Sequence, residues 1–166
     1  MIRAVIVGGG ISGLTAGVAL RRAGHLVHIY ERSDLRNEVG AAINVPPNVS
    51  RFLTSWGLDP VRSCFVKAKV LEWCDPFTAE VKATISHEHN TTRFGPGAEL
   101  WLAHRVDLHR ALRHMAVDPE GPGTPVTLHP QSHVVRYVSD LWSETCRSGL
   151  CVANAHRLWR IPTHPL

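Results

Sequence analysis

Three glycines with the spacing Gly8-x-Gly10-x-x-Gly13 stand between two apolar segments near the start of the sequence. Arg3 to Val7, before them, has the composition of a buried strand, and the Ala-, Leu- and Val-rich segment after them ends at Ala23-Gly24. This order is typical of the strand, tight turn and helix of a dinucleotide-binding βαβ unit, in which the second glycine lets a pyrophosphate approach the backbone. We therefore predict phosphate binding at the start of this helix, where the peptide dipoles amount to about half a positive charge.

A carboxylate follows the next predicted strand. Leu26 to Tyr30 has the pattern of a second buried strand, and Glu31 stands at its carboxyl end. A carboxylate at this place accepts hydrogen bonds from the hydroxyls of an adenosine ribose and repels a 2′-phosphate. The sequence thus favours FAD or NAD over NADP as the bound nucleotide.

Composition and charge narrow the class of protein. The 166 residues carry a formal charge of +4, but the Lys and Arg are dispersed, so we do not expect nucleic-acid binding. No window approaches the roughly 18 apolar residues of a membrane span. The four cysteines form no Cys-x-x-Cys pair, which favours a reducing, cytoplasmic location.

The middle of the sequence has small residues, then a helix, then short strands. Residues 40–42, Gly-Ala-Ala, allow the backbone to approach a flat or bulky group. In the helix that follows, Phe52 is expected to pack into the hydrophobic core. Apolar and polar residues alternate between Lys67 and His89, which predicts an antiparallel hairpin with one covered face. The two histidines of His87-Glu-His89 have no third ligand nearby, so a surface hairpin is favoured and no metal site is predicted.

A further strand ends at a basic residue. Glu99 to His104 is apolar and leads to Arg105, where a guanidinium at a strand-to-helix junction can reach a bound anion or pair with a nearby acid. Asp107 is expected to cap the following helix, and its histidines are expected on the surface. Residues 141–166 have no usable period, so we divide the sequence into 1–140 and an unrelated or divergent tail, 141–166.

The order of these motifs, together with Pro46-Pro-Asn48 and Trp56-Gly57-Leu58, resembles the FAD-dependent aromatic-ring monooxygenases of the salicylate hydroxylase type, especially fungal members. The resemblance covers about residues 2 to 138. It implies bound FAD, reduction by NAD(P)H, and oxygenation of a small aromatic or secondary-metabolite substrate. It assigns no catalytic residue. The cofactor-binding residues that it implies are Gly8, Gly10, Gly13, Glu31, Asn44, through its backbone, and Arg105.

The later motifs of that family, an Ala-Asp-Gly and a Gly-Asp, are absent. The predicted fold class is therefore α/β: a Rossmann-like FAD-binding βαβ domain with an inserted antiparallel β-hairpin region, truncated. We expect that a frameshift, an unspliced intron or a faulty gene model replaced the sequence after Asp140. Such a chain is expected to retain FAD weakly or not at all, to lack turnover, and to self-associate through an exposed sheet edge. Two alternatives remain, an NAD-dependent dehydrogenase and a non-catalytic nucleotide-binding or partner-binding module.

Overall fold

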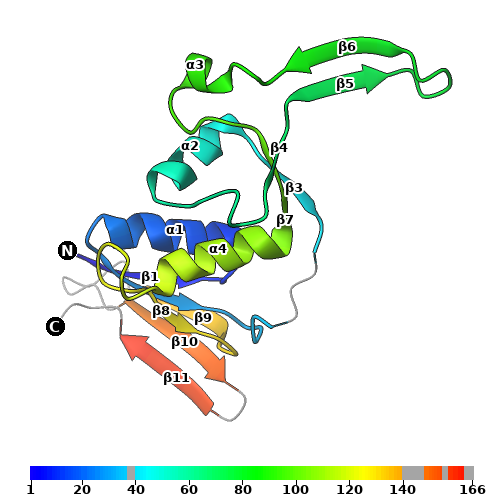
Figure 1. Cartoon of the computed structure of the whole chain (residues 1–166). Helices are drawn as coiled ribbons and strands as arrows, with labels where there is room; N and C mark the ends of the chain where they lie inside the picture. Colours follow the sequence, from blue (N-terminus) through cyan, green and yellow to red (C-terminus); the bar gives the residue numbers. More distant parts are fainter. Residues whose placement is uncertain (37–39, 140–147, 155–156, 163–166) are drawn as a thin grey trace. The chain divides into compact units, whose positions relative to one another are not determined.

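The computed structural model describes residues 1–36, 40–139, 148–154 and 157–162. The chain divides into two compact units (Figure 1). The first consists of Met1–Glu38 and Leu112–Leu166, and the second of Val39–Ala111. Each unit has its own strands and core, and each is described by itself.

The first unit contains a three-stranded parallel sheet in the order β1-β2-β8. Its strands are β1 (Arg3–Val7), β2 (Leu26–Tyr30) and β8 (Thr127–His129), and helix α1 (Ile11–Arg22) connects the first two. Residues of α1 and of β2 form the centre of the core: Leu14, Val18, Val27 and Ile29 are at most 2% exposed. The predicted strand, turn, helix and strand are therefore confirmed.

One buried charge ties α1 to a distant loop. The side chain of Arg21 is 1% exposed. Its guanidinium donates hydrogen bonds of 2.6 to 3.3 Å to backbone carbonyl oxygens. The acceptors belong to Met115, Ala116, Asp118, Gly121 and Gly123. Because the charge is shared among carbonyl dipoles, the guanidinium is stabilised without a carboxylate among these acceptors.

A second sheet of the first unit is antiparallel and has the order β11-β10-β9. Its strands are β9 (His133–Ser139), β10 (Ser148–Asn154) and β11 (Arg157–Pro162). The sequence of residues 141–166 has no usable period and predicts neither helix nor strand, yet β10 and β11 lie within it. Strand β10 pairs with both β11 and β9, and such pairing does not require regular alternation of polar and apolar residues.

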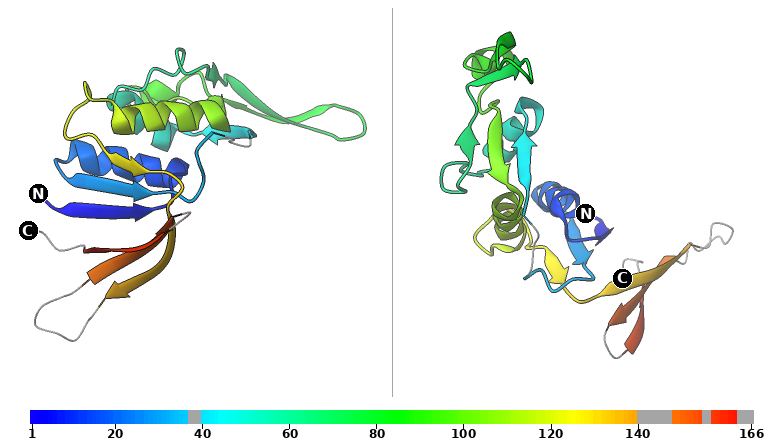
Figure 2. Two further views of the ribbon diagram at one scale, coloured as in Figure 1. Left: turned by 90° about the horizontal axis from the view of Figure 1, so that it is seen from below. Right: turned by 90° about the vertical axis from the view of Figure 1, so that its right-hand side faces the viewer.

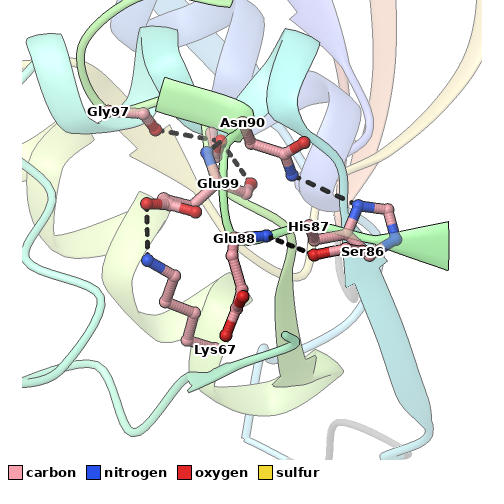
Figure 3. A network of polar contacts seen from close by, with 8 residues as sticks. Lys67, Ser86, His87, Glu88, Asn90, Gly97 and Glu99 are labelled. Carbon is pink, nitrogen blue, oxygen red and sulfur yellow. Dashed lines mark hydrogen bonds and ion pairs between the residues drawn. The ribbon is translucent and has the colours of Figure 1, made fainter. Parts of the chain in front are cut away.

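The second unit is built on the antiparallel sheet β3-β7-β4. It contains β3 (Ala42–Val45), α2 (Pro47–Ser55), β4 (Val66–Lys67), α3 (Asn90–Phe94), β7 (Trp101–His104) and the start of α4 (Arg105–Val117). The buried hydroxyl of Ser50 accepts a hydrogen bond from Glu99 N at 3.0 Å, and it lies 2.7 Å from Glu99 O. The carboxylate of Glu99 pairs with Lys67 at 2.6 Å, so α2, β4 and the segment before β7 are joined (Figure 3).

The predicted hairpin is present as β5 (Val70–Cys74) and β6 (Val81–Ser86). It projects from the rest of its unit as a two-stranded ribbon (Figure 2). Every residue of both strands is exposed, so the expectation of one covered face is not met within the described part of the chain. Alternation of polar and apolar residues indicates a strand, but it does not supply the layer that would cover it.

Three smaller expectations are also corrected. Phe52 is 49% exposed, whereas its neighbour Leu53 is 3% exposed and occupies the core position. His109, expected on the surface, is 3% exposed. Helix α4 begins at Arg105, so Asp107 lies in its first turn rather than at its cap. Each of these errors is a shift of one or two positions around a helix, and such shifts change which side chain faces inward.

We predict that replacing Arg21 by Leu lowers the free energy of unfolding by about 3 kcal/mol or more, because the buried carbonyl acceptors lose their donor. Urea denaturation followed by circular dichroism measures this change. Arg113→Leu, at an exposed position of α4 (Arg105–Val117), is the control and is expected to change stability by about 0.5 kcal/mol or less. Equal stability of the two variants would contradict the role given to Arg21.

Candidate functional site

The glycine turn after β1 has the geometry that its sequence predicts. Gly8 has a φ of 102°, in the region that favours glycine, and its N–H donates to Tyr30 O at 2.8 Å. A Cβ placed on Gly13 would lie 1.9 Å from Gly8 O. Only glycine at position 13 therefore allows α1 to pack this closely against the turn.

Gly10 differs from Gly13 because the space beside it is open. A Cβ on Gly10 would meet no heavy atom of the described chain within 4 Å. Gly10 is also the N-cap of α1, no side chain caps the helix, and no acidic residue lies in its first turn. The first N–H groups of the helix thus face a place where an anion can approach the backbone.

Glu31 is held against this turn by two backbone groups. Its carboxylate accepts hydrogen bonds from Gly9 N at 2.6 Å and from Ser33 N at 2.8 Å. Burial raises the pKa of Glu31, but the hydrogen bonds from Ser33 and Gly9 and the charge of Arg32 outweigh it, so the pKa is below its ordinary value. An ionised carboxylate has about four acceptor positions, so it can still accept ribose hydroxyl groups.

A cavity of about 230 Å³ opens at the carboxyl ends of β1 and β2. Gly8, Tyr30 and Glu31 line one part of it, and residues 132–134 line another. Ligands of open parallel sheets bind at this end of the strands, and the volume suits part of a dinucleotide rather than all of it. Nothing in the sequence indicates that residues 132–134 line a cavity with Glu31. They come close because β2 pairs with β8, which is distant in the sequence.

Three rings are stacked beside this cavity. The ring centroid of His129 lies 4.3 Å from that of Tyr30 and 5.4 Å from that of His28. His28 Nδ1 and His129 Nε2 are 3.1 Å apart. Burial lowers the pKa of both histidines, and for His28 the charges of His129 and Arg3 add to the effect. The pair is therefore favoured in its neutral form, and the sequence pattern gave no sign of it.

The remaining two predicted residues lie in the second unit. Asn44 is an exposed residue of β3, opposite Leu102 of β7. Arg105 follows β7 directly, and its N–H donates to Ala41 O at 2.9 Å. The antiparallel pairing thus brings Asn44 and Arg105 into one region, while Gly8, Gly10, Gly13 and Glu31 form the site of the first unit. Gly40 lies against the His104 ring, since a Cβ on Gly40 would lie 2.0 Å from that ring.

Among the described residues, no group of three or more His, Cys, Asp or Glu is placed to hold a metal ion. A search of the same residues finds no helix with the length and apolar character needed to cross a membrane.

We predict that Glu31→Gln reduces the loss of stability in acid. The folded pKa of Glu31 is lowered, so its contribution is complete above the unfolded value of about 4.5 and is lost as the pH falls through the folded value. The variant is expected to be about 1 kcal/mol less stable than wild type at pH 7 and to approach it in acid. Urea denaturation between pH 3 and about 7 measures this, with Glu72→Gln on the exposed β5 as the control. A constant difference across this range would show that ionisation of Glu31 is not involved.

The sequence of this chain is similar to one family model and to several known proteins. The family model of the NAD(P)-binding Rossmann-like domain matches residues 6–53, which include the glycine turn and Glu31. The chain is 52% identical over 145 residues to FAD-dependent monooxygenase cfoG of Aspergillus candidus, covering 87% of this chain and 33% of that protein. It is 38% identical over 148 residues to hispidin-3-hydroxylase of Neonothopanus nambi, covering 87% and 34%.

A solved structure has the same fold. The 2,6-dihydroxypyridine-3-hydroxylase from Arthrobacter nicotinovorans aligns with a TM-score of 0.64 and 25% identity, over 97% of this chain and 35% of that one. The chain spans about a third of the length of the curated relatives it matches. In sequence, in fold and in the glycine turn, this chain is similar to about a third of the length of these FAD-dependent monooxygenases and hydroxylases.

Proposed function

We propose that this chain binds FAD at the glycine turn of its first unit, as the FAD-binding part of a monooxygenase that uses NAD(P)H and O2. The observation that carries the proposal is the open space at Gly10, beside the uncapped start of α1 and the cavity lined by Glu31. Bound FAD supplies the redox chemistry of such an enzyme. The residues of this chain hold and orient it.

Each group of the first unit has one task in this proposal. The N–H groups at the start of α1 donate to the pyrophosphate, which comes close because Gly10 has no side chain. The free acceptor positions of Glu31 bind the hydroxyls of the adenosine ribose, while its charge disfavours a 2′-phosphate. The neutral pair His28 and His129 adds no positive charge beside the cavity at neutral pH.

Asn44, through its backbone, and Arg105, through its guanidinium, are proposed as two further cofactor-binding residues of the chain. Arg105 lies in the first turn of α4, directly after β7, and is partly buried. A guanidinium held at such a junction is a suitable donor for a phosphate or a carbonyl oxygen. No residue of this chain is proposed as a general acid or base.

The proposed substrate is a small aromatic or secondary-metabolite molecule, which becomes hydroxylated or epoxidised. Relatives named for hispidin and for 3-hydroxybenzoate support this class. An NAD-dependent dehydrogenase is disfavoured because two relatives, 52% and 36% identical to this chain, are named as FAD-dependent monooxygenases. We further propose a cytoplasmic location, which the free thiols of Cys64 and Cys74 support.

We predict that Gly10→Ala weakens FAD binding at least tenfold without changing stability, because the new methyl group meets nothing in the protein but lies where the pyrophosphate approaches. Weak binding is expected even for the wild type, so titration of flavin fluorescence is a better measurement than retention on a column. Gly13→Ala is the contrasting variant and is expected to lose stability, because its Cβ would clash with Gly8 O. Equal FAD affinity of Gly10→Ala and wild type would reject the site.

The alternative of a partner-binding module is favoured by one observation, the exposed apolar hairpin. Trp73 is 50% exposed and Phe77 at the turn is 95% exposed. Neither β5 nor β6 pairs with a further strand in the described part of the chain. We therefore propose self-association through this two-stranded sheet, since an unpaired edge with apolar side chains readily pairs with another copy.

We predict that Trp73→Lys weakens this self-association by about tenfold, because a charge on a flat strand opposes pairing with a second copy. Sedimentation velocity over a range of protein concentrations measures the monomer fraction. The control is Val61→Lys, at a position that is 73% exposed but lies outside the hairpin, and it is expected to behave as wild type. A wild-type chain that stays monomeric at all concentrations would refute the proposal.

A further inference from the structure

The second unit contains a cavity that none of the roles above uses. Its volume is about 500 Å³, and it lies between the first turns of α2, the end of β6 and helix α3. Pockets of this volume hold small organic molecules. All of its lining residues belong to the second unit, so the cavity is independent of the glycine turn.

Charge in this cavity has one sign. Arg51 of α2 and Arg93 of α3 line it from two sides, and its lining contains no Asp or Glu. Neither arginine has an ion-pair partner among the residues that the structure describes. Helix α2 begins at Pro47 with no acidic residue in its first turn, so its dipole adds to the positive potential. The cavity therefore favours an anion.

A buried polar group in the lining lacks an acceptor. Asn90, 6% exposed, places Nδ2 3.3 Å from His87 Nδ1 (Figure 3). With the amide as donor, His87 accepts at Nδ1 and carries its proton on Nε2. This Nε2 is inaccessible to water and has no hydrogen-bond partner within the described residues. A buried donor without an acceptor is costly, so the lining of this cavity contains one unsatisfied polar group.

Two large apolar side chains also line the cavity. Ile85 and Phe94 line the cavity and remain 46% and 44% exposed, respectively. The guanidinium of Arg93 lies over the Phe94 ring, 4.9 Å from its centroid, which holds the charge beside an apolar surface. An inorganic anion would use the arginines but would leave these side chains exposed. An aromatic ring with a carboxylate would contact both.

We propose that this cavity is a binding site for a monocyclic aromatic carboxylate. Its carboxylate pairs with Arg51 and Arg93, and its ring packs on Ile85 and Phe94. The site goes beyond the proposed function, because it needs neither FAD nor turnover and lies in the other unit.

The test is direct binding of benzoate to the 166-residue chain without FAD, measured by calorimetry and by shifts of backbone amide resonances. We expect benzoate to bind and to shift the resonances of Asn90 and Arg93. The neutral benzamide is expected to bind at least tenfold more weakly, and inorganic phosphate likewise, because each lacks one of the two features that the cavity recognises. This comparison uses only wild-type protein, so it does not depend on the folding of a variant.

Location is tested by removing the charges one at a time. Arg51→Gln and Arg93→Gln are each expected to weaken benzoate binding about fivefold to tenfold, the cost of losing one charge-assisted hydrogen bond. Arg62→Gln is the matched control, because Arg62 is an exposed arginine of the same unit outside the cavity. Circular dichroism verifies that each variant is folded.

Several outcomes would overturn the proposal. Phosphate binding as tightly as benzoate would reduce the cavity to a general anion site, and benzamide binding as tightly would exclude recognition of charge. Unchanged affinity in both arginine variants would place benzoate elsewhere. A titration of FAD on the same samples is a separate readout. If the wild-type chain binds FAD but not benzoate, only this aromatic-carboxylate site is rejected. If it binds benzoate but not FAD, only the proposed cofactor site is rejected.

Discussion

The close approach of Gly13 to the carbonyl group of Gly8 is the constraint on which the first unit depends. The place that a Cβ would occupy at Gly13 is only 1.9 Å from Gly8 O, so α1 can begin here only if residue 13 has no side chain. This contact sets where the free N–H groups of α1 point. It also places the turn within reach of Glu31, whose carboxylate accepts the Gly9 N–H. The absence of a side chain at Gly13 therefore determines both the position of the first N–H groups of α1 and their proximity to Glu31.

The far end of the same helix is fixed by electrostatics instead. Arg21 is buried and satisfied by carbonyl groups of residues 115–123, so the end of α1 is tied to the segment that leads into β8. Strand β8 pairs with β2, and residues 132–134 just after it line the cavity beside Gly8 and Glu31. The lining of the cavity therefore depends on a contact made at the opposite end of the helix, far from any ligand.

How much of this could be predicted depends on how local each feature is. The turn at Gly8, the helix after Gly10 and the acid at Glu31 lie within about two dozen residues, and the backbone needs of each fix the residue type. Arg21 gave no such signal, because its acceptors are backbone groups some 95 residues away and any residue provides a carbonyl. The prediction that one face of the hairpin is covered was wrong for a related reason. Alternation shows that a face is apolar but not whether anything covers it.

The two cavities are suited to anions by different physical means. At the proposed cofactor site the donors are backbone N–H groups and Glu31 lines the cavity. We expect the choice of ligand to depend on the missing side chain at Gly10 and on the charge of Glu31. In the second unit the donors are the side chains of Arg51 and Arg93, and the lining contains no acid. A backbone site is tied to the fold, whereas a side-chain site can change through single substitutions. A chain with both can therefore keep one nucleotide while its preference for a second, smaller anion changes.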